Sequence, residues 1–240
     1  TIRGWSQLLS SVPHNQQLDQ TRSDYPVMVD QRPFPLTPVQ HAYFIGRQSH
    51  QILGGVGCHL YQEFNCSNIN VEQLESAWRQ LTSRHRMFHV HFTDNAQQCW
   101  HEEDRWRGIT VHDLQNLDTH SQQHELFMIR QQLSHRRLNV EQGETFDVQV
   151  SLLSNKMCRI HINLDLLIAD AASFTLIFDE LSLILQGSSL PELDPHYDFC
   201  SYLSQKAQET AQSYQTDREY WLSLLHTFPA APALPLAILP

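Results

Sequence analysis

The sequence has no apolar run long enough to span a membrane, which requires about 20 consecutive apolar residues. A secretory signal is also missing, since the short apolar stretch near the N-terminus is followed by a polar segment. No internal repeat is evident along the 240 residues, a length that suits one large domain or two small ones. We therefore expect a cytoplasmic globular protein with no membrane partner.

Positive charge is scarce. The chain has 16 Lys and Arg against 26 Asp and Glu, which gives a net charge of −10, and no stretch forms a basic stripe. Such a chain repels nucleic acid and anionic lipid unless a local patch compensates. A regulator that binds nucleic acid is therefore disfavoured, and we expect no nucleic-acid partner.

Paired cysteine motifs are absent as well. The five cysteines are widely spaced, odd in number and form no C-x-x-C: Cys58, Cys66, Cys99, Cys158 and Cys200. This usage is typical of reduced thiols in a cytosolic protein. Two groups of histidines stand out, His120 with His124 and His85 with His89 and His91. Neither has a third ligand at a characteristic spacing, so we predict no metal site.

The most informative stretch lies between residues 163 and 179. Residues Met157–Leu164 alternate polar and apolar, which predicts a half-buried strand. Residues Ser173–Leu185 carry apolar side chains at helical spacing, with Ser173 as the expected N-cap. Asp165 and Asp170 lie between them in an apolar run, where acids must be paired, hydrogen-bonded or protonated. The turn is a candidate site, although Asp165 could simply end the strand and Asp170 could simply help to cap the helix.

A second signal opens the folded region. In Phe34–Arg47, Thr37 is the expected N-cap, Pro38 occupies the first helical position and Gln40 the capping-box position. Alternating strand and helix patterns follow, with a hairpin expected around Ser154–Asn155. The further strands are expected at 59–66, 89–93, 99–102, 109–113 and 145–153, and the further helices at 70–84, 118–137, 197–212 and 216–225. This order predicts an α/β or α+β sandwich.

The N-terminal 33 residues have a different character. Thr1–Ser11 reads as a short amphipathic helix, and Val12–Pro33 reads as a linker rich in Gln, Asp, Ser and Pro. A lone helix followed by a linker has nothing to pack against. We therefore interpret residues 1–11 as the last helix of an upstream domain, residues 12–33 as a linker and residues 34–240 as the folded domain.

Three motifs carry a resemblance to a known family. D-x-x-x-x-D-x-x-S, formed by Asp165, Asp170 and Ser173, resembles the signature of the heterocyclization domains of nonribosomal peptide synthetases. Ordinary condensation domains carry H-H-x-x-x-D-G there, and Ala171 replaces that glycine. The opening FPLTPVQHAYFIGR fills every fixed position of the family's F-P-L-T-x-x-Q-x-A-Y-x-x-G-R. The stretch RHRMF resembles R-H-x-M-L, with Phe88 in place of Leu.

The resemblance implies a chloramphenicol-acetyltransferase-like fold of two lobes, of which this chain would be the N-terminal one. It implies condensation of a carrier-bound acyl thioester with a carrier-bound cysteine, serine or threonine, followed by cyclodehydration to a thiazoline or oxazoline. It implies that residues 1–11 are the C-terminal helix of an upstream carrier-like domain. The implied partners are upstream and downstream carrier domains, the second lobe and an adjoining adenylation domain. Substrates would arrive on phosphopantetheine arms, with no cofactor bound directly. The region 54–64 looks most like domains from siderophore synthetases.

The resemblance also assigns roles. Asp165, Asp170 and Ser173 would form the catalytic motif, supported by a second set: Gln40, Tyr43, Arg47, Arg84 and His85. We expect Asp165 to face the substrate tunnel, and Asp170 to be an inward acid in a salt bridge with Arg47 or Arg84. The lobe alone is expected to be inactive, because the tunnel needs its second half. The alternative is a degenerate condensation-like lobe that docks carrier proteins without chemistry.

Overall fold

The computed structural model describes residues 32–51, 54–101, 106–194 and 197–230. The chain divides into two units, residues 1–196 and 197–240. The helix predicted at residues 1–11 lies outside the described residues, as does the linker at 12–33 apart from its last two residues. The closing segment from residue 231 lies outside them too.

A four-stranded sheet organises the first unit. Its order is β2 (His59–Ser67), β7 (Met157–Asp165), β6 (Phe146–Leu152) and β5 (Thr110–Asp113). Neighbours are antiparallel except β5, which runs parallel to β6. The predicted hairpin between β6 and β7 is confirmed, with a turn at Ser154–Lys156.

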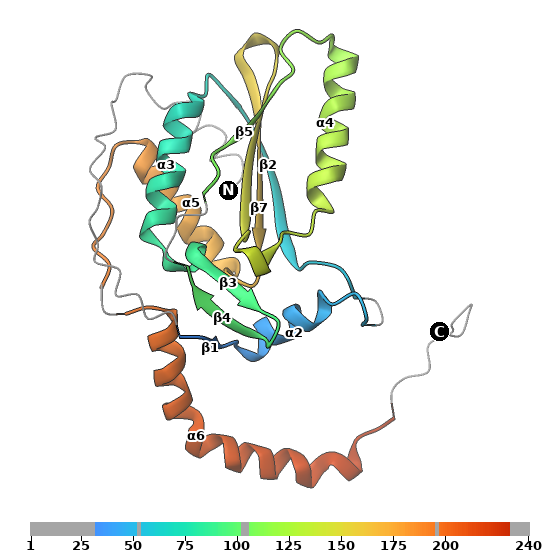
Figure 1. Ribbon diagram of the computed structural model, residues 1–240, viewed down its shortest axis with the longest axis vertical. Helices are drawn as coiled ribbons and strands as arrows, with labels where there is room; N and C mark the ends of the chain where they lie inside the picture. Colours follow the sequence, from blue (N-terminus) through green and yellow to red (C-terminus); the bar gives the residue numbers. More distant parts are fainter. Residues whose placement is uncertain (1–31, 52–53, 102–105, 195–196, 231–240) are drawn as a thin grey trace. The chain divides into compact units, whose positions relative to one another are not determined.

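Helices cover both faces of this sheet (Figure 1). Helices α3 (Val71–Arg84) and α5 (Ala171–Leu185) lie on one face, and α4 (Thr119–Ser134) lies on the other. The face toward α3 and α5 is apolar, and there the rings of Phe64 and Phe178 are centred 5.2 Å apart. Its buried side chains come from alternate strand positions: Phe64, Cys66, Val148, Val150, Cys158, Ile160, Ile162 and Leu164. The layered arrangement confirms the predicted sandwich of helices and sheet.

A smaller sheet holds the start of the folded region. Its order is β1 (Phe34–Pro35), β4 (Gln97–Trp100) and β3 (Val90–Thr93), all antiparallel. Helix α2 (Pro38–Gly46) follows β1, and the predicted capping box is present. The Thr37 hydroxyl accepts the Gln40 N–H at 3.1 Å, and the Gln40 side chain accepts the Thr37 N–H at 2.9 Å. Two orphan N–H groups of the helix start are thereby satisfied.

The face of β7 toward α4 differs from its prediction. The alternation in residues 157–164 predicted a half-buried strand, yet every residue from Ile160 to Asp165 is buried. The polar positions of β7 lie under α4, where Asn163 donates to the Leu133 carbonyl oxygen at 2.9 Å. The prediction was wrong because alternation identifies two chemically different faces and does not say what covers each.

The second unit contains one long helix where two were predicted. Helix α6 (Phe199–Leu224) runs without interruption through the break expected between residues 212 and 216. No proline or glycine stands in that interval, so nothing in the chain ends the helix there. The Asp198 side chain caps its start by accepting the Ser201 N–H at 2.8 Å.

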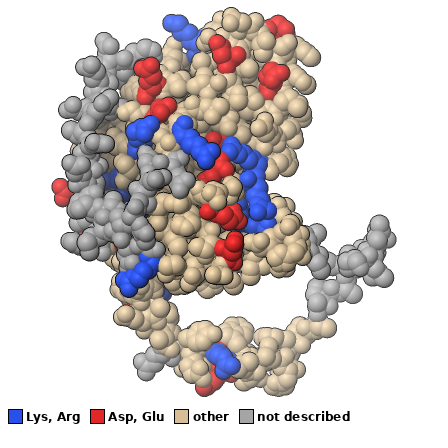
Figure 2. Space-filling model, viewed as in Figure 1, with Lys and Arg blue, Asp and Glu red and all other residues tan. Residues whose placement is uncertain are grey.

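The surface carries charges of both signs. On the face drawn in Figure 2, the Lys and Arg side chains of the described residues are interspersed with Asp and Glu rather than gathered in one stripe. Among the described helices, none combines the length and the hydropathy required to cross a membrane.

Candidate functional site

Asp165 ends β7 and makes a buried ion pair. Arg47, the residue after α2, places Nη1 2.5 Å from Asp165 Oδ2, and both side chains are almost completely buried, at 0% and 1% exposed. Arg47 Nη2 donates to the Leu138 carbonyl oxygen. Gly57 leaves room for this guanidinium, because a Cβ there would lie 3.0 Å from Nη1. The opening motif and the aspartate motif therefore meet at this pair.

The second oxygen of Asp165 is also occupied. Oδ1 accepts the Leu167 N–H at 3.0 Å, so the carboxylate stabilises the turn that follows β7. Burial raises the pKa of Asp165, and the nearby Arg47 cation offsets this only in part. Asp165 was predicted to face the substrate, and that prediction was wrong. Its side chain is buried, and a charged group there has to be paired on both oxygens.

Gln40 holds the same turn from another side. Its Nε2 donates to the Leu167 carbonyl oxygen at 2.6 Å and to Gln98 Oε1 at 3.2 Å. Gln40 is buried, and its Oε1 serves the capping box of α2. Two residues of the opening motif, Gln40 and Arg47, thus fix the backbone that follows Asp165. The predicted support role of both is consistent with this geometry.

Tyr43 is linked to the Arg47–Asp165 pair through Cys58. Its side chain hydrogen-bonds Cys58, a half-buried thiol beside the Asp165 carboxylate. Burial and then the Asp165 charge raise the pKa of Cys58. Outside the ion pair, Arg137 Nη1 donates to the Arg47 carbonyl oxygen at 2.8 Å. Tyr43 therefore lies beside the turn that it was predicted to support.

Asp170 is the exposed acid of the motif. It is the N-cap of α5, and its Oδ1 accepts both the N–H and the hydroxyl of Ser173 at 2.8 Å. These two hydrogen bonds, the backbone one first, lower the pKa of Asp170. We predicted an inward acid paired with Arg47 or Arg84 and Ser173 as the cap, and both predictions were wrong. Arg47 reaches Asp165 instead, and the N-cap of the helix is Asp170, three residues before the expected Ser173.

Arg84 and His85 join α3 to α5. Arg84 Nε lies 3.1 Å from Glu180 Oε2, and His85 Nε2 lies 2.6 Å from the same oxygen. Glu180 is buried and comes ten residues after Asp170, which is roughly 15 Å along α5. These motif residues therefore stabilise the packing of the helix that carries Asp170, rather than contacting Asp170 themselves.

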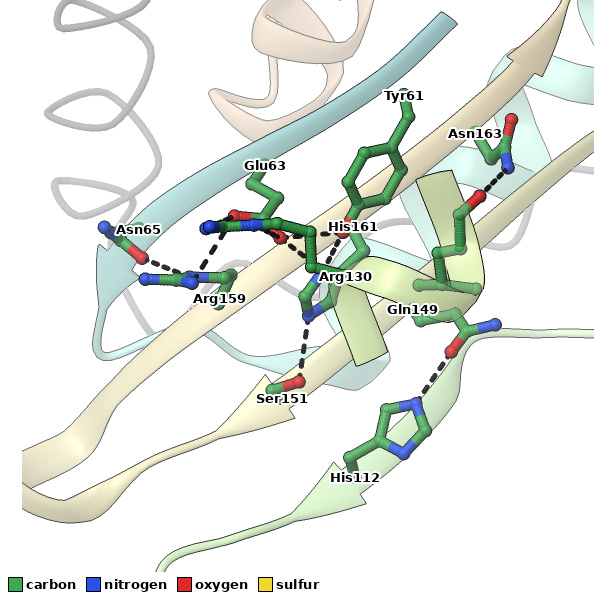
Figure 3. A network of polar contacts seen from close by, with 11 residues as sticks. Tyr61, Glu63, Asn65, His112, Arg130, Gln149, Ser151, Arg159, His161 and Asn163 are labelled. Carbon is green, nitrogen blue, oxygen red and sulfur yellow. Dashed lines mark hydrogen bonds and ion pairs between the residues drawn. The ribbon is translucent and has the colours of Figure 1, made fainter. Parts of the chain in front are cut away.

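A polar network that the sequence did not reveal lies between the sheet and α4 (Figure 3). His161 of β7 is 1% exposed and contacts the Tyr61 hydroxyl through Nδ1 at 2.8 Å and the Ser151 hydroxyl through Nε2 at 2.9 Å. Tyr61 donates to Glu63 Oε1 at 2.7 Å. Arg130 of α4 closes the network on both Glu63 oxygens, at 3.0 and 2.5 Å.

The titration behaviour of this network follows from burial. Burial lowers the pKa of His161 to about 4, so the imidazole is neutral. Burial, followed by the hydrogen bond to Glu63, raises the pKa of Tyr61. Burial alone would raise the pKa of Glu63, but hydrogen bonds from Arg130 and Tyr61 outweigh it and leave that pKa lowered. One proton order satisfies every group: Ser151 donates to His161, His161 to Tyr61, and Tyr61 to Glu63.

The Ser151–His161 contact has the distance of a nucleophile and its base. Ser151 is 0% exposed, however, and His161 is covered by α4, so neither group can contact a substrate carried on a partner domain. We assign the network a structural role. The polar residues at alternate positions of β7 were the signal in the sequence, but their partners Tyr61, Ser151 and Arg130 are distant along the chain.

Two groups of histidines stood out in the sequence, and no metal site was predicted for either. His120 and His124 are exposed on α4. Across the parts of the chain that the structure describes, no three His, Cys, Asp or Glu side chains are placed to hold a metal ion.

Known proteins are similar to this chain in sequence and in fold. Residues 30–238 match the Condensation domain family. The chain is 35% identical over 204 residues to the phenyloxazoline synthase MbtB of Mycobacterium sp. (strain MCS), covering 85% of this chain and 17% of that protein. It is 31% identical over 217 residues to the pyochelin synthetase PchE of Pseudomonas aeruginosa (strain UCBPP-PA14), covering 87% and 14%.

A solved structure shows the same likeness. The EpoB cyclization-docking bidomain of the nonribosomal peptide synthetase from Sorangium cellulosum superposes with a TM-score of 0.77 at 26% sequence identity. The match covers 87% of this chain and 41% of that one. The fold therefore defines a chloramphenicol-acetyltransferase-like lobe of mixed α/β structure with two sheets.

The chain belongs to the Condensation domain family of nonribosomal peptide synthetases. The resemblance inferred from the three motifs is confirmed, and the relatives named above are synthases and synthetases of this kind. The chain spans less than a fifth of the length of either curated relative, at 17% and 14%.

Proposed function

We propose that the chain is the N-terminal lobe of a heterocyclization domain that acts within a longer synthetase, with siderophore biosynthesis as its setting. The observation that carries the proposal is the junction of the opening motif with the aspartate motif, in which Arg47 pairs with Asp165 and Gln40 binds the Leu167 carbonyl oxygen. The relatives described above, a phenyloxazoline synthase, a pyochelin synthetase and a cyclization-docking bidomain, support the same class.

The proposed reaction has two parts. An amine on the downstream carrier attacks the acyl thioester, so that a C–N bond forms, the C–S bond breaks and the upstream arm leaves as a thiol. The cysteine, serine or threonine side chain then attacks the new amide carbonyl carbon. This attack forms a C–S or C–O bond that closes the ring. The former carbonyl oxygen then leaves as water, the amide nitrogen loses its proton, and a C=N bond forms within the ring. Both parts need proton transfers, and positioning of the two carriers lowers the barrier by several kcal/mol.

We assign the two acids different parts in this chemistry. Asp165 is a positioning residue, since both of its oxygens are held by Arg47 and the Leu167 N–H. Asp170 is exposed and ionised, and Ser173 donates both its N–H and its hydroxyl to Oδ1. In the proposed reaction the exposed carboxylate accepts a proton or orients the amine. Ser173 fixes the direction of that carboxylate.

The partners follow from the same proposal. Upstream and downstream carrier domains would present substrates on phosphopantetheine arms, and the lobe itself would bind no cofactor. The second lobe of the domain would complete the tunnel over the exposed start of α5, and an adenylation domain would load the downstream carrier. The alternative, a lobe that docks carriers without chemistry, predicts carrier binding with no product.

The substitution Asp170→Asn in the full synthetase tests the assignment. Asparagine caps a helix as well as aspartate does, so the fold is kept while the charge is removed. We expect product formation to fall about 100-fold, the scale of a lost general base, with carrier affinity and melting temperature unchanged. Product is measured by mass spectrometry of the downstream carrier.

The matched control is Asp179→Asn, a second exposed acid on α5, which should leave the rate unchanged. Full turnover by the Asp170→Asn synthetase would show that Asp170 is only a helix cap. Carrier binding without turnover by the unsubstituted synthetase would favour the docking alternative.

A further inference from the structure

Two buried thiols lie side by side on neighbouring strands of the four-stranded sheet. Cys66 near the end of β2 and Cys158 near the start of β7 are directly opposite in the antiparallel register. They are 2% and 1% exposed and belong to the apolar face toward α3 and α5. Neither residue is part of the aspartate motif, and both are free thiols in this structure.

The two sulfur atoms are already in contact. Cys66 Sγ and Cys158 Sγ lie 2.8 Å apart, and the Cys158 thiol also lies 3.5 Å from the Cys66 carbonyl oxygen. The Asn68 N–H donates to the Lys156 carbonyl oxygen, and the Leu166 N–H donates to the Cys58 carbonyl oxygen. In an antiparallel pair of strands, hydrogen-bonded and non-hydrogen-bonded residue pairs alternate. Positions 66 and 158 are therefore a hydrogen-bonded pair, whose Cα atoms are about 5.5 Å apart. That spacing is within the range of disulfides, so a bridge needs no backbone movement.

The surroundings make the two thiols unequal. The hydrogen bond to Cys158 and then burial raise the pKa of Cys66. The same contact lowers the pKa of Cys158, because the Cys66 thiol stabilises the Cys158 thiolate. A thiolate is the form of cysteine that reacts with oxidants, so the direction of these shifts favours Cys158 as the attacking group, and the 2.8 Å contact places Cys66 to resolve the product.

We propose that Cys66 and Cys158 are a redox modification site, which a peroxide oxidant converts into a disulfide that joins β2 to β7. The Cys158 thiolate attacks hydrogen peroxide, the O–O bond breaks, and a sulfenic acid and hydroxide result. The Cys66 sulfur attacks the sulfenic sulfur, the S–O bond breaks, and the oxygen leaves with the Cys66 proton as water. The net reaction consumes two thiols and one peroxide and yields one disulfide and two waters.

The bridge would stabilise the sheet without reaching the site. It would connect residues 92 positions apart in sequence, and closing a loop of that length constrains the unfolded chain strongly. Cys158 lies seven residues before Asp165, which is roughly 23 Å along β7. In a reducing compartment the pair stays as thiols, and oxidation adds a cross-link to the strand that ends at the Arg47–Asp165 pair.

Peptide mapping after peroxide treatment tests the proposal. The folded chain is treated with hydrogen peroxide, alkylated, digested without reductant and analysed by mass spectrometry. We expect a linked pair of peptides that contain Cys66 and Cys158, and a melting temperature that rises by roughly 5–15 °C. Dithiothreitol should reverse both changes.

Two alanine variants identify the cause. Cys66→Ala should abolish the linked peptide and the rise in melting temperature, whereas Cys99→Ala, at a buried cysteine outside the pair, should keep both. If Cys66→Ala does not fold, the peptide map of the unsubstituted chain still decides. The absence of that linked pair, or a rise in melting temperature that persists in Cys66→Ala, would overturn the proposal.

Discussion

The substitution Asp165→Ala is expected to lower the free energy of unfolding by about 3–5 kcal/mol, because it leaves the Arg47 guanidinium buried without its carboxylate. Arg47→Ala should cost a similar amount, since it leaves Asp165 unpaired instead. The measurement is urea unfolding of each variant, with the midpoint and slope fitted together.

The two matched controls separate pairing from capping. Asp170→Ala removes only an exposed N-cap and should cost about 1 kcal/mol. The double variant Arg47→Met with Asp165→Leu removes both charges, and much of the lost stability should return. Equal losses for Asp165→Ala and Asp170→Ala would contradict the division of roles between the two acids.

The second large effect is a pH dependence that originates at His161. Its folded pKa is about 4, against an ordinary value of about 6.5, so the unfolded chain binds a proton that the folded chain refuses. The stabilising contribution is complete above the unfolded pKa and is lost as the pH falls from about 6.5 to about 4. The difference between the two values corresponds to roughly 3 kcal/mol.

The substitution His161→Gln should remove this dependence, because glutamine stays neutral over the whole range. The measured quantity is the difference in unfolding free energy between the unsubstituted chain and the variant, at pH 7 and again at pH 4. It should fall by roughly 3 kcal/mol. The control is His120→Gln, at an exposed histidine of α4. Its unfolding free energy should differ from that of the unsubstituted chain by the same amount at pH 7 and at pH 4. A difference that does not change with pH would mean that His161 titrates alike in both states.

The local parts of the fold could be predicted from the sequence. The capping box of Thr37 and Gln40 and the hairpin turn at residues 154–156 each depend on a few neighbouring residues. Such signals act through bonds that span three or four positions, so the residue types alone identify them.

The non-local parts could not. The sequence showed two acids and two candidate arginines. That Arg47 pairs with Asp165 depends on where α2 lies relative to the end of β7. The order of polar and apolar residues in β7 likewise did not show that α4 covers the polar side, where Arg130 reaches Glu63. Both outcomes are decided by packing between segments more than 60 residues apart.

The proposed heterocyclization is tested most directly by the intact mass of the product on the downstream carrier. The full synthetase is incubated with an acyl-loaded upstream carrier and a downstream carrier loaded with cysteine, serine or threonine, and the 240-residue chain alone serves as the control. We predict a product lighter by one water than the linear amide with the full synthetase, and no product with the chain alone. Accumulation of the linear amide without loss of water, or turnover by the isolated chain, would contradict the proposal.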